Sequence, residues 1–162
     1  MPMKVYLIRH GIAEERYTFA QTGRPDTERP LTTKGKERMH RITEQFAEHE
    51  SKIDLFLQSP LKRSQQTVDI LKKYFKDSKT KTTPHLAPGF SARMLFQCLK
   101  ENFDKDSIAL VGHEPDMGQF LSWLIFQQAS DSFPMKRGGI AKLDLYEDNS
   151  CYLKWFLRPK FF

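Results

Sequence analysis

The chain has 162 residues, 39% of them hydrophobic and 12% aromatic, so we predict one domain spanning residues 1–162 around a single hydrophobic core. The formal net charge of +6 would attract anions, but the 26 Lys and Arg are mixed with 20 Asp and Glu and form no basic run with interleaved aromatics, which argues against nucleic-acid binding. The two cysteines have no metal-ligand spacing, and no apolar stretch approaches the roughly 20 residues that span a bilayer. We therefore expect a cytoplasmic protein without a metal site, a cofactor or a membrane segment.

Short apolar runs alternate with amphipathic segments along the rest of the chain. The runs predict strands, and apolar residues at helical spacing predict the helices between them. Thr32 and Thr33 can cap the first helix, Ser59 before a proline is a typical helix start, and Asp148-Asn149 marks a hairpin turn. In chain order the pattern predicts strand 4–8, helix 34–49, strand 53–57, helix 61–75, a polar loop at 77–84 that can hold a short strand, helix 92–102, strand 107–111, helix 115–128 and a hairpin of strands 140–146 and 152–156.

Alternation of strands and helices is typical of a parallel sheet that is covered by helices on both faces. We therefore predict an α/β fold of three layers (α/β/α), with a mainly parallel central sheet and a C-terminal antiparallel hairpin. In open sheets of this kind, ligands bind outside the carboxyl ends of the strands. The residues that follow the strands are thus the first candidates for a functional site.

Three of the predicted strands are followed by residues that suit phosphate. Arg9 and His10 follow the first strand, Arg63 lies shortly after the second, and His113 follows the strand at 107–111. Arginine presents a planar fork of donors that matches phosphate oxygens. A neutral imidazole nitrogen is a nucleophile that can form a covalent phosphoryl intermediate, and surrounding cations can offset the charge that Mg²⁺ neutralises elsewhere. The set predicts phosphoryl transfer without a metal ion.

Four motifs carry a resemblance to a known family. They are LIRHG at 7–11, RPLT at 29–32 followed by Gly35, SPLKRSQQT at 59–67 and VGHEP at 111–115. In this order and spacing they resemble the blocks of the histidine phosphatase superfamily, the phosphoglycerate mutase-like enzymes, across nearly the whole chain. Because the chain is short and has no large inserted helical subdomain, it is most similar to the SixA-type phosphohistidine phosphatases.

The resemblance implies a role for each matching residue. It implies that His10 is the nucleophile and becomes a phosphohistidine, that Arg9 and Arg63 bind phosphate, and that His113 contacts the transferring phosphoryl group. Arg29 lies in a block that borders the family's site and is a further candidate for substrate contact. The implied partner is a protein that carries phosphohistidine, such as a histidine-containing phosphotransfer domain.

One position departs from many relatives of this family. Phosphomonoesterases and mutases place a glutamate general acid before the third helix, where this chain has HLAPG at 85–89 and no carboxylate. His85 or Glu114 can substitute for that acid, or no dedicated acid exists. The SixA-type members resemble this chain in lacking it.

We therefore predict a phosphatase that hydrolyses protein phosphohistidine through a covalent intermediate at His10. The alternatives are a phosphomonoesterase of the same fold that acts on a small-molecule phosphate, and a non-catalytic phosphate-binding module. Arg29 and His85 can equally belong to the scaffold. Ser59 is expected to be a helix cap because no GxSxG elbow surrounds it, and Cys98 is expected in the core.

Overall fold

The molecule is built on one six-stranded sheet, and the computed structural model describes residues 1–161. The strands are β1 (Met3–Arg9), β2 (Leu55–Gln58), β3 (Lys79–Thr82), β4 (Ser107–Gly112), β5 (Ile140–Leu145) and β6 (Cys151–Leu157). The α-helices are α1 (Arg16–Ala20), α2 (Thr33–His49), α3 (Lys62–Tyr74), α4 (Ala92–Lys100) and α5 (Asp116–Phe126). Three short 3-10 turns are η1 (Asp26–Glu28), η2 (Pro84–Leu86) and η3 (Pro159–Phe161).

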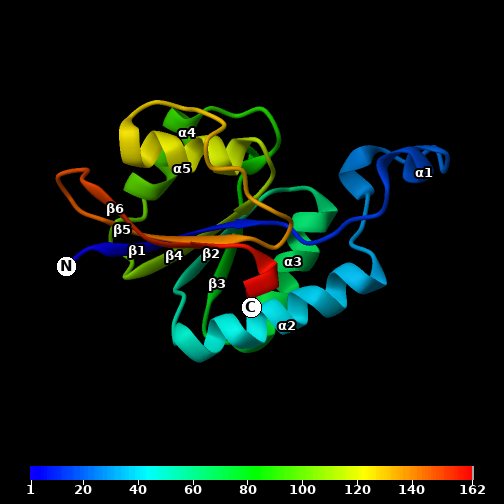
Figure 1. The fold of residues 1–162 in the computed structure, drawn as a ribbon, viewed down its shortest axis with the longest axis horizontal. Helices are drawn as coiled ribbons and strands as arrows, with labels where there is room; N and C mark the ends of the chain where they lie inside the picture. Colours follow the sequence, from blue (N-terminus) through cyan, green and yellow to red (C-terminus); the bar gives the residue numbers. More distant parts are fainter. Residues whose placement is uncertain (162) are drawn as a thin grey trace.

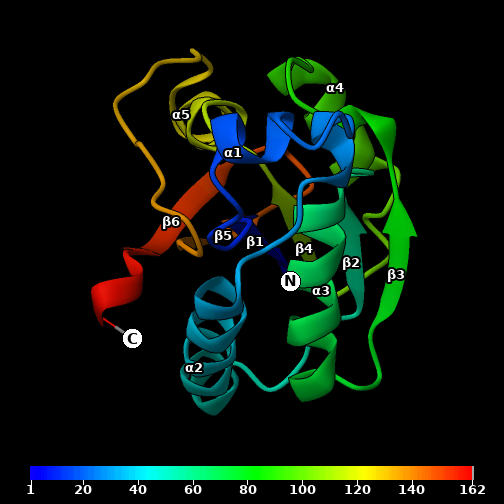
Figure 2. The same cartoon turned by 90° about the vertical axis from the view of Figure 1, so that its right-hand side faces the viewer.

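The strand order across the sheet is β3-β2-β4-β1-β5-β6. The first four of these strands are parallel, whereas β5 pairs antiparallel with β1 and β6 pairs antiparallel with β5. Helices α4 and α5 cover one face of the sheet, and α2 and α3 cover the other (Figures 1 and 2). The structure thus confirms the predicted three-layer α/β fold with a mainly parallel sheet and a C-terminal antiparallel hairpin.

Strand β1 lies inside the sheet and supplies residues to both cores. Val5 and Leu7 pack in the core under α4 and α5, whereas Tyr6 and Ile8 pack in the core over α2 and α3. All four side chains are fully buried. Burying side chains of this size stabilises the fold by roughly 1.5 to 3 kcal/mol each, so both cores hold β1 and the residues at its carboxyl end in place.

Two local features differ from the prediction. The polar loop before α2 contains the helix α1, which is too short to show periodicity and is capped by the Glu15 carboxylate, an acceptor for the backbone N–H groups of Tyr17 and Thr18. The expectation that Ser59 caps a helix is wrong, because α3 has Leu61 as its N-cap and no side-chain cap. The predicted cap of α2 is confirmed, since Thr32 accepts from the Gly35 backbone N–H at 2.8 Å.

The possible strand in the polar loop is confirmed as β3, which pairs only with β2 and forms one edge of the sheet. All four of its residues are exposed. The predicted hairpin turn is also present, with Asn149 in the left-handed region at φ 72°. No helix within residues 1–161 is long and apolar enough to cross a membrane.

Candidate active site

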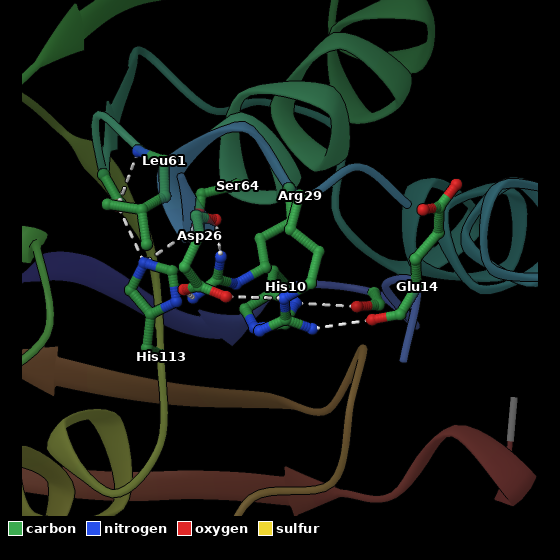
Figure 3. Close-up of polar contacts among 10 residues, drawn as sticks. His10, Glu14, Asp26, Arg29, Leu61, Ser64 and His113 are labelled. Carbon is green, nitrogen blue, oxygen red and sulfur yellow. Dashed lines mark hydrogen bonds and ion pairs between the residues drawn. The ribbon is translucent and has the colours of Figure 1, made fainter. Parts of the chain in front are cut away.

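A cavity of about 610 Å³ lies at the carboxyl ends of β1 and β4. The structure brings the five predicted site residues together in its wall. They come from the end of β1, the loop before α2, the first turn of α3 and the end of β4 (Figure 3). The five are Arg9, His10, Arg29, Arg63 and His113.

The His10 ring is held in one tautomer. Its Nδ1 lies 2.7 Å from the carbonyl oxygen of Gly11. A carbonyl oxygen can only accept, so Nδ1 carries the ring proton and Nε2 keeps its lone pair. Burial lowers the pKa of His10 to about 3, and the charges of Arg63 and Arg9 lower it as well. His10 is therefore a neutral imidazole with a free Nε2 at neutral pH.

His113 is oriented by a serine from another motif. Its Nε2 lies 2.7 Å from Ser59 Oγ, and this oxygen already accepts the backbone N–H of Leu61 at 3.1 Å. The Ser59 hydroxyl can donate its proton to Nε2, and in that arrangement the ring proton of His113 lies on Nδ1. Burial lowers the pKa of His113 to about 3. Its ring centroid lies 5.1 Å from that of His10, so the two neutral rings are neighbours.

Asp26 in η1 anchors two of the arginines. Its carboxylate lies 3.2 Å from Arg63 Nη2 and 2.7 Å from Arg29 Nε, and its carbonyl oxygen accepts from Arg63 Nη1 at 3.1 Å. The pKa of Asp26 is lowered by these arginines, against a rise from burial, so it is a carboxylate at neutral pH. Figure 3 shows the Asp26 carboxylate between His113 and Arg29. The ion pair of Asp26 with Arg63 therefore holds the loop before α2 against the wall of the cavity.

Three buried nitrogen atoms of the cavity residues have no hydrogen-bond partner. They are Arg9 Nε, Arg63 Nε and His113 Nδ1. Buried donors are nearly always paired in native proteins, and leaving one unpaired costs roughly 1 to 3 kcal/mol. The residues that carry these donors come from three separate segments and line one cavity. An anion with several oxygens could pair with all three, so the arrangement suits a phosphoryl group.

Contacts between the motifs explain why they converge. Gly11 N–H donates to Thr67 Oγ1 at 3.1 Å, and Leu31 N–H donates to Gln66 Oε1 at 2.7 Å. Gly35 packs so closely that a Cβ there would lie 2.1 Å from the Ile12 carbonyl oxygen. The segment that carries His10 is thus fixed to both α2 and α3.

The two candidates for a general acid differ in position. Glu114 lines the cavity, and burial raises its pKa, but its two oxygens accept the backbone N–H groups of Gly118 and Met135 at 2.7 and 3.1 Å. His85 lies in η2, packs against Phe90 and does not line the cavity. No three His, Cys, Asp or Glu side chains within residues 1–161 are grouped as metal ligands.

The motifs in the sequence did not indicate two cations of the cavity, nor the orienting roles of Ser59 and Asp26. Arg16 and Arg137 line the same cavity as His10, and Ser59 orients His113. Arg137 reaches the site because the N–H of Gly138 donates to the carbonyl oxygens of Arg9 and His10. The only signal in the sequence is a cationic pair directly before two glycines at 138–139.

Comparison with known proteins places the chain in a family. The model of the histidine phosphatase superfamily (branch 1) matches residues 5–87. An uncharacterized protein of Picosynechococcus sp. is 31% identical over 168 residues, which cover 96% of this chain and 99% of that protein. The chain belongs to the histidine phosphatase superfamily. Members of this superfamily are phosphatases, so the cavity has the setting of a hydrolase site.

Solved structures of histidine phosphatases share the fold. The protein histidine phosphatase SixA in complex with tungstate has a TM-score of 0.84 and 24% identity, with 98% of each chain covered. The protein named SixA from Agrobacterium tumefaciens has a TM-score of 0.83 and 25% identity, covering 98% of this chain and 99% of that one. A phosphoserine phosphatase from Entamoeba histolytica has a TM-score of 0.71 and 17% identity, with 98% of each chain covered. The superfamily fold therefore serves more than one phosphorylated substrate.

Proposed function

We propose that this histidine phosphatase hydrolyses phosphohistidine on another protein, in two steps through a phosphorylated His10. The observation that carries the proposal is the pairing of a neutral nucleophile with unpaired donors. His10 has its Nε2 lone pair available, and buried nitrogens of Arg9, Arg63 and His113 in the same cavity have no partner. Donors placed in advance around a transferring phosphoryl group are the main source of stabilisation in reactions of this type.

In the first step, His10 Nε2 attacks the phosphorus and the bond from phosphorus to the substrate imidazole breaks. The electron pair returns to the substrate ring, which leaves neutral because its other nitrogen carries a proton. The positive charge that the substrate ring loses appears on phosphorylated His10. There, Nδ1–H still donates to the Gly11 carbonyl oxygen, and this hydrogen bond stabilises the cationic ring.

In the second step, water attacks the phosphorus and the bond to Nε2 breaks. The electron pair returns to Nε2, one proton of the water passes to solvent, and inorganic phosphate leaves. Arg9, Arg63 and the Nδ1–H of His113 donate to the non-bridging oxygens in both steps. We expect no metal ion to be needed, because these groups supply the positive charge, and a chelator should leave the rate unchanged.

The carboxyl groups near the cavity support phosphohistidine over an alkyl phosphate. Glu15 and Glu114 accept backbone N–H groups, Asp26 is held by arginines, and the carboxylate of Glu14 points away from His10 (Figure 3). An alkoxide that leaves without a positioned proton donor loses a factor of roughly 10² to 10⁴ in rate. Imidazole leaves as a neutral ring and does not need that donor.

A phosphomonoesterase is the second candidate function, and one observation favours it. Burial raises the pKa of Glu114, which is the direction expected for a general acid. In that case Glu114 would protonate the leaving oxygen of a small phosphate ester. The two functions therefore differ in what they require of this one side chain.

The deciding experiment compares kcat/KM for a phosphohistidine protein, a phosphoserine peptide and an aryl phosphate, in the wild type and in Glu114→Gln. We expect the phosphohistidine protein to exceed the phosphoserine peptide by roughly 100-fold or more, because only the ester needs an acid. Glu114→Gln should change the phosphohistidine rate only a few-fold. Equal or faster turnover of phosphoserine that is lost in Glu114→Gln would establish the phosphomonoesterase instead, and no turnover of any substrate would indicate a binding module.

A further inference from the structure

A second cavity, of about 470 Å³, lies beside the first. Its wall is formed by α2, by the turn before β5 and by the segment after β6, and Ile12 and Pro159 are its only uncharged lining residues. Among residues 1–161, six cationic side chains and no carboxylate side chain line it. We call it the cationic groove, and its charged residues are Arg9, Arg38, Lys136, Arg137, Arg158 and Lys160.

The cationic groove is continuous with the catalytic cavity, since Arg9 and Arg137 line both. The sheet topology explains this position. Ile8, Ile140 and Leu157 are neighbours across β1, β5 and β6. The residues that precede β5 and those that follow β6 therefore lie at the same end of the strands as His10. Figure 2 shows the C-terminal segment at this side of the sheet, near α2.

Within residues 1–161, the six cations of the groove form no ion pair with a carboxylate. Some cations elsewhere on the surface pair with acids, as Arg24 does with Glu28 and Lys154 with Asp144. Burial lowers the pKa of Arg9 and the nearby charge of Arg137 lowers it as well, against a rise from the charge of Glu114. Cations gathered this closely favour an anionic occupant.

The exposure of the groove residues indicates the kind of anion. In the catalytic cavity Arg63 is held in place, since it is 3% exposed and paired with Asp26. In the cationic groove, Lys136, Arg158 and Lys160 are exposed. Exposed, mobile cations at the rim of a site steer and orient a large charged partner, whereas a small phosphorylated ligand is bound by fixed buried donors.

We infer that the cationic groove is a docking surface for acidic side chains of the protein whose phosphohistidine enters the catalytic cavity. This inference rests on the proposed function, because it assigns the groove to the same substrate. Carboxylates beside the phosphohistidine would lie against the groove while the phosphoryl group reaches His10. Such contacts act mainly on association, so they lower KM for the protein substrate and leave the chemical step unchanged.

The test compares two triple variants that remove the same number of charges. The groove variant is Lys136→Gln, Arg158→Gln and Lys160→Gln, three residues outside the wall of the catalytic cavity. The control variant is Lys72→Gln, Lys73→Gln and Lys76→Gln, at the end of α3 remote from the site. None of the six substituted residues belongs to the two hydrophobic cores. Both variants lower the net charge by the same amount.

Steady-state kinetics are measured with a phosphorylated histidine phosphotransfer domain that has an acidic surface around its phosphohistidine, and with p-nitrophenyl phosphate. At low salt we expect the groove variant to lose about tenfold or more in kcat/KM on the domain through KM, and less than twofold on p-nitrophenyl phosphate. The control variant should lose less than twofold on both substrates. Raising the ionic strength should slow the wild type on the domain and affect the groove variant much less.

The outcomes separate the inference from the proposed function. If the wild type acts on the domain but the groove variant matches the control variant, the docking inference is wrong and the proposed function stands. Equal losses on both substrates would also overturn the inference, because the groove would then serve the chemistry. If the wild type hydrolyses p-nitrophenyl phosphate but not the domain, the proposed function is wrong. The docking inference is then wrong as well, because it rests on that function.

Discussion

At the scale of single residues, the chemistry depends on which nitrogen of each histidine carries a proton. The Gly11 carbonyl oxygen fixes that proton on Nδ1 of His10, and Ser59 favours it on Nδ1 of His113. The motifs pointed to both histidines, since their residue types carry the chemistry. They could not reveal Ser59 or Asp26 as partners, because these contacts join segments that are distant in the sequence and exist only once the sheet has formed.

Replacing His10 with Ala should lower turnover of an aryl phosphate by roughly 10³-fold or more, because no other group offers the nucleophile. The variant should keep its fold, with a similar circular dichroism spectrum, since the ring contacts the cavity and not the cores. An acid-labile radiolabel on the wild type should be absent from the variant. His49→Ala, at the exposed end of α2, is the control, and full activity in His10→Ala would rule out this nucleophile.

Replacing Arg63 with Lys should lower kcat/KM on an aryl phosphate by about 10- to 100-fold. Lysine keeps the charge, but it loses the planar fork that contacts Asp26 through two nitrogens. Inhibition by vanadate, which mimics the transferring phosphoryl group, should weaken in parallel. Arg41→Lys on the exposed surface of α2 should change neither quantity. A lysine variant as active as the wild type would show that charge alone suffices.

The two buried histidines should make stability fall in mild acid. The pKa of His10 is about 3 in the folded protein and 6.5 when the ring is free in water, so below pH 6.5 the unfolded chain binds a proton that the folded protein does not. The free energy of unfolding therefore decreases as pH falls from about 6.5 towards 3. Denaturant titrations at pH 7 and pH 4.5 should show a loss that is smaller in His10→Ala by roughly 2 kcal/mol. An identical pH dependence in the two proteins would contradict a neutral, buried His10.

At the scale of elements, the fold was largely predictable because strands and helices of ordinary length show periodicity. The exceptions have physical causes. Helix α1 has five residues, fewer than two turns, so it shows no periodicity. A glutamate cap before it does not distinguish its sequence from that of a polar loop. Strand β3 has no buried residue, so its sequence shows no apolar alternation. Of the two missed cations, Arg16 begins the short helix α1, and Arg137 lies before β5, whose position depends on long-range pairing with β1.

Gly35→Ala should test how closely α2 holds the segment of His10. A Cβ at this position would lie 2.1 Å from the Ile12 carbonyl oxygen, which is a backbone atom and cannot rotate away. We expect the free energy of unfolding to fall by roughly 2 to 4 kcal/mol and kcat to fall several-fold, as measured by denaturant titration and aryl phosphate turnover. Lys34→Ala, an exposed neighbour in the same turn, should stay within about 0.5 kcal/mol of the wild type. A stable, fully active Gly35→Ala would show that the backbone at Ile12 can move to accommodate a Cβ at position 35.

At the scale of the whole molecule, the strand order places the site in the middle of the sheet and the edge strands β3 and β6 on either side of it. Strands β1 and β4 lie at the centre of the sheet, where both cores support them, and the residues at their ends form the cavity. Such a site is rigid because its supporting strands are buried on both faces.

The exposed edge strand β3 has a consequence for how the molecules behave together. Its free side presents unpaired backbone groups, which are a template for joining another sheet, and its sequence alternates Lys79 and Lys81 with threonines. The lysines repel a second copy of the same edge, so they act as gatekeepers against self-association. Lys79→Val combined with Lys81→Val should leave turnover per dissolved molecule unchanged, yet light scattering during refolding at high concentration should rise well above that of the wild type. Light scattering of the double variant equal to that of the wild type would mean that the short length of β3, and not its lysines, keeps the protein from aggregating.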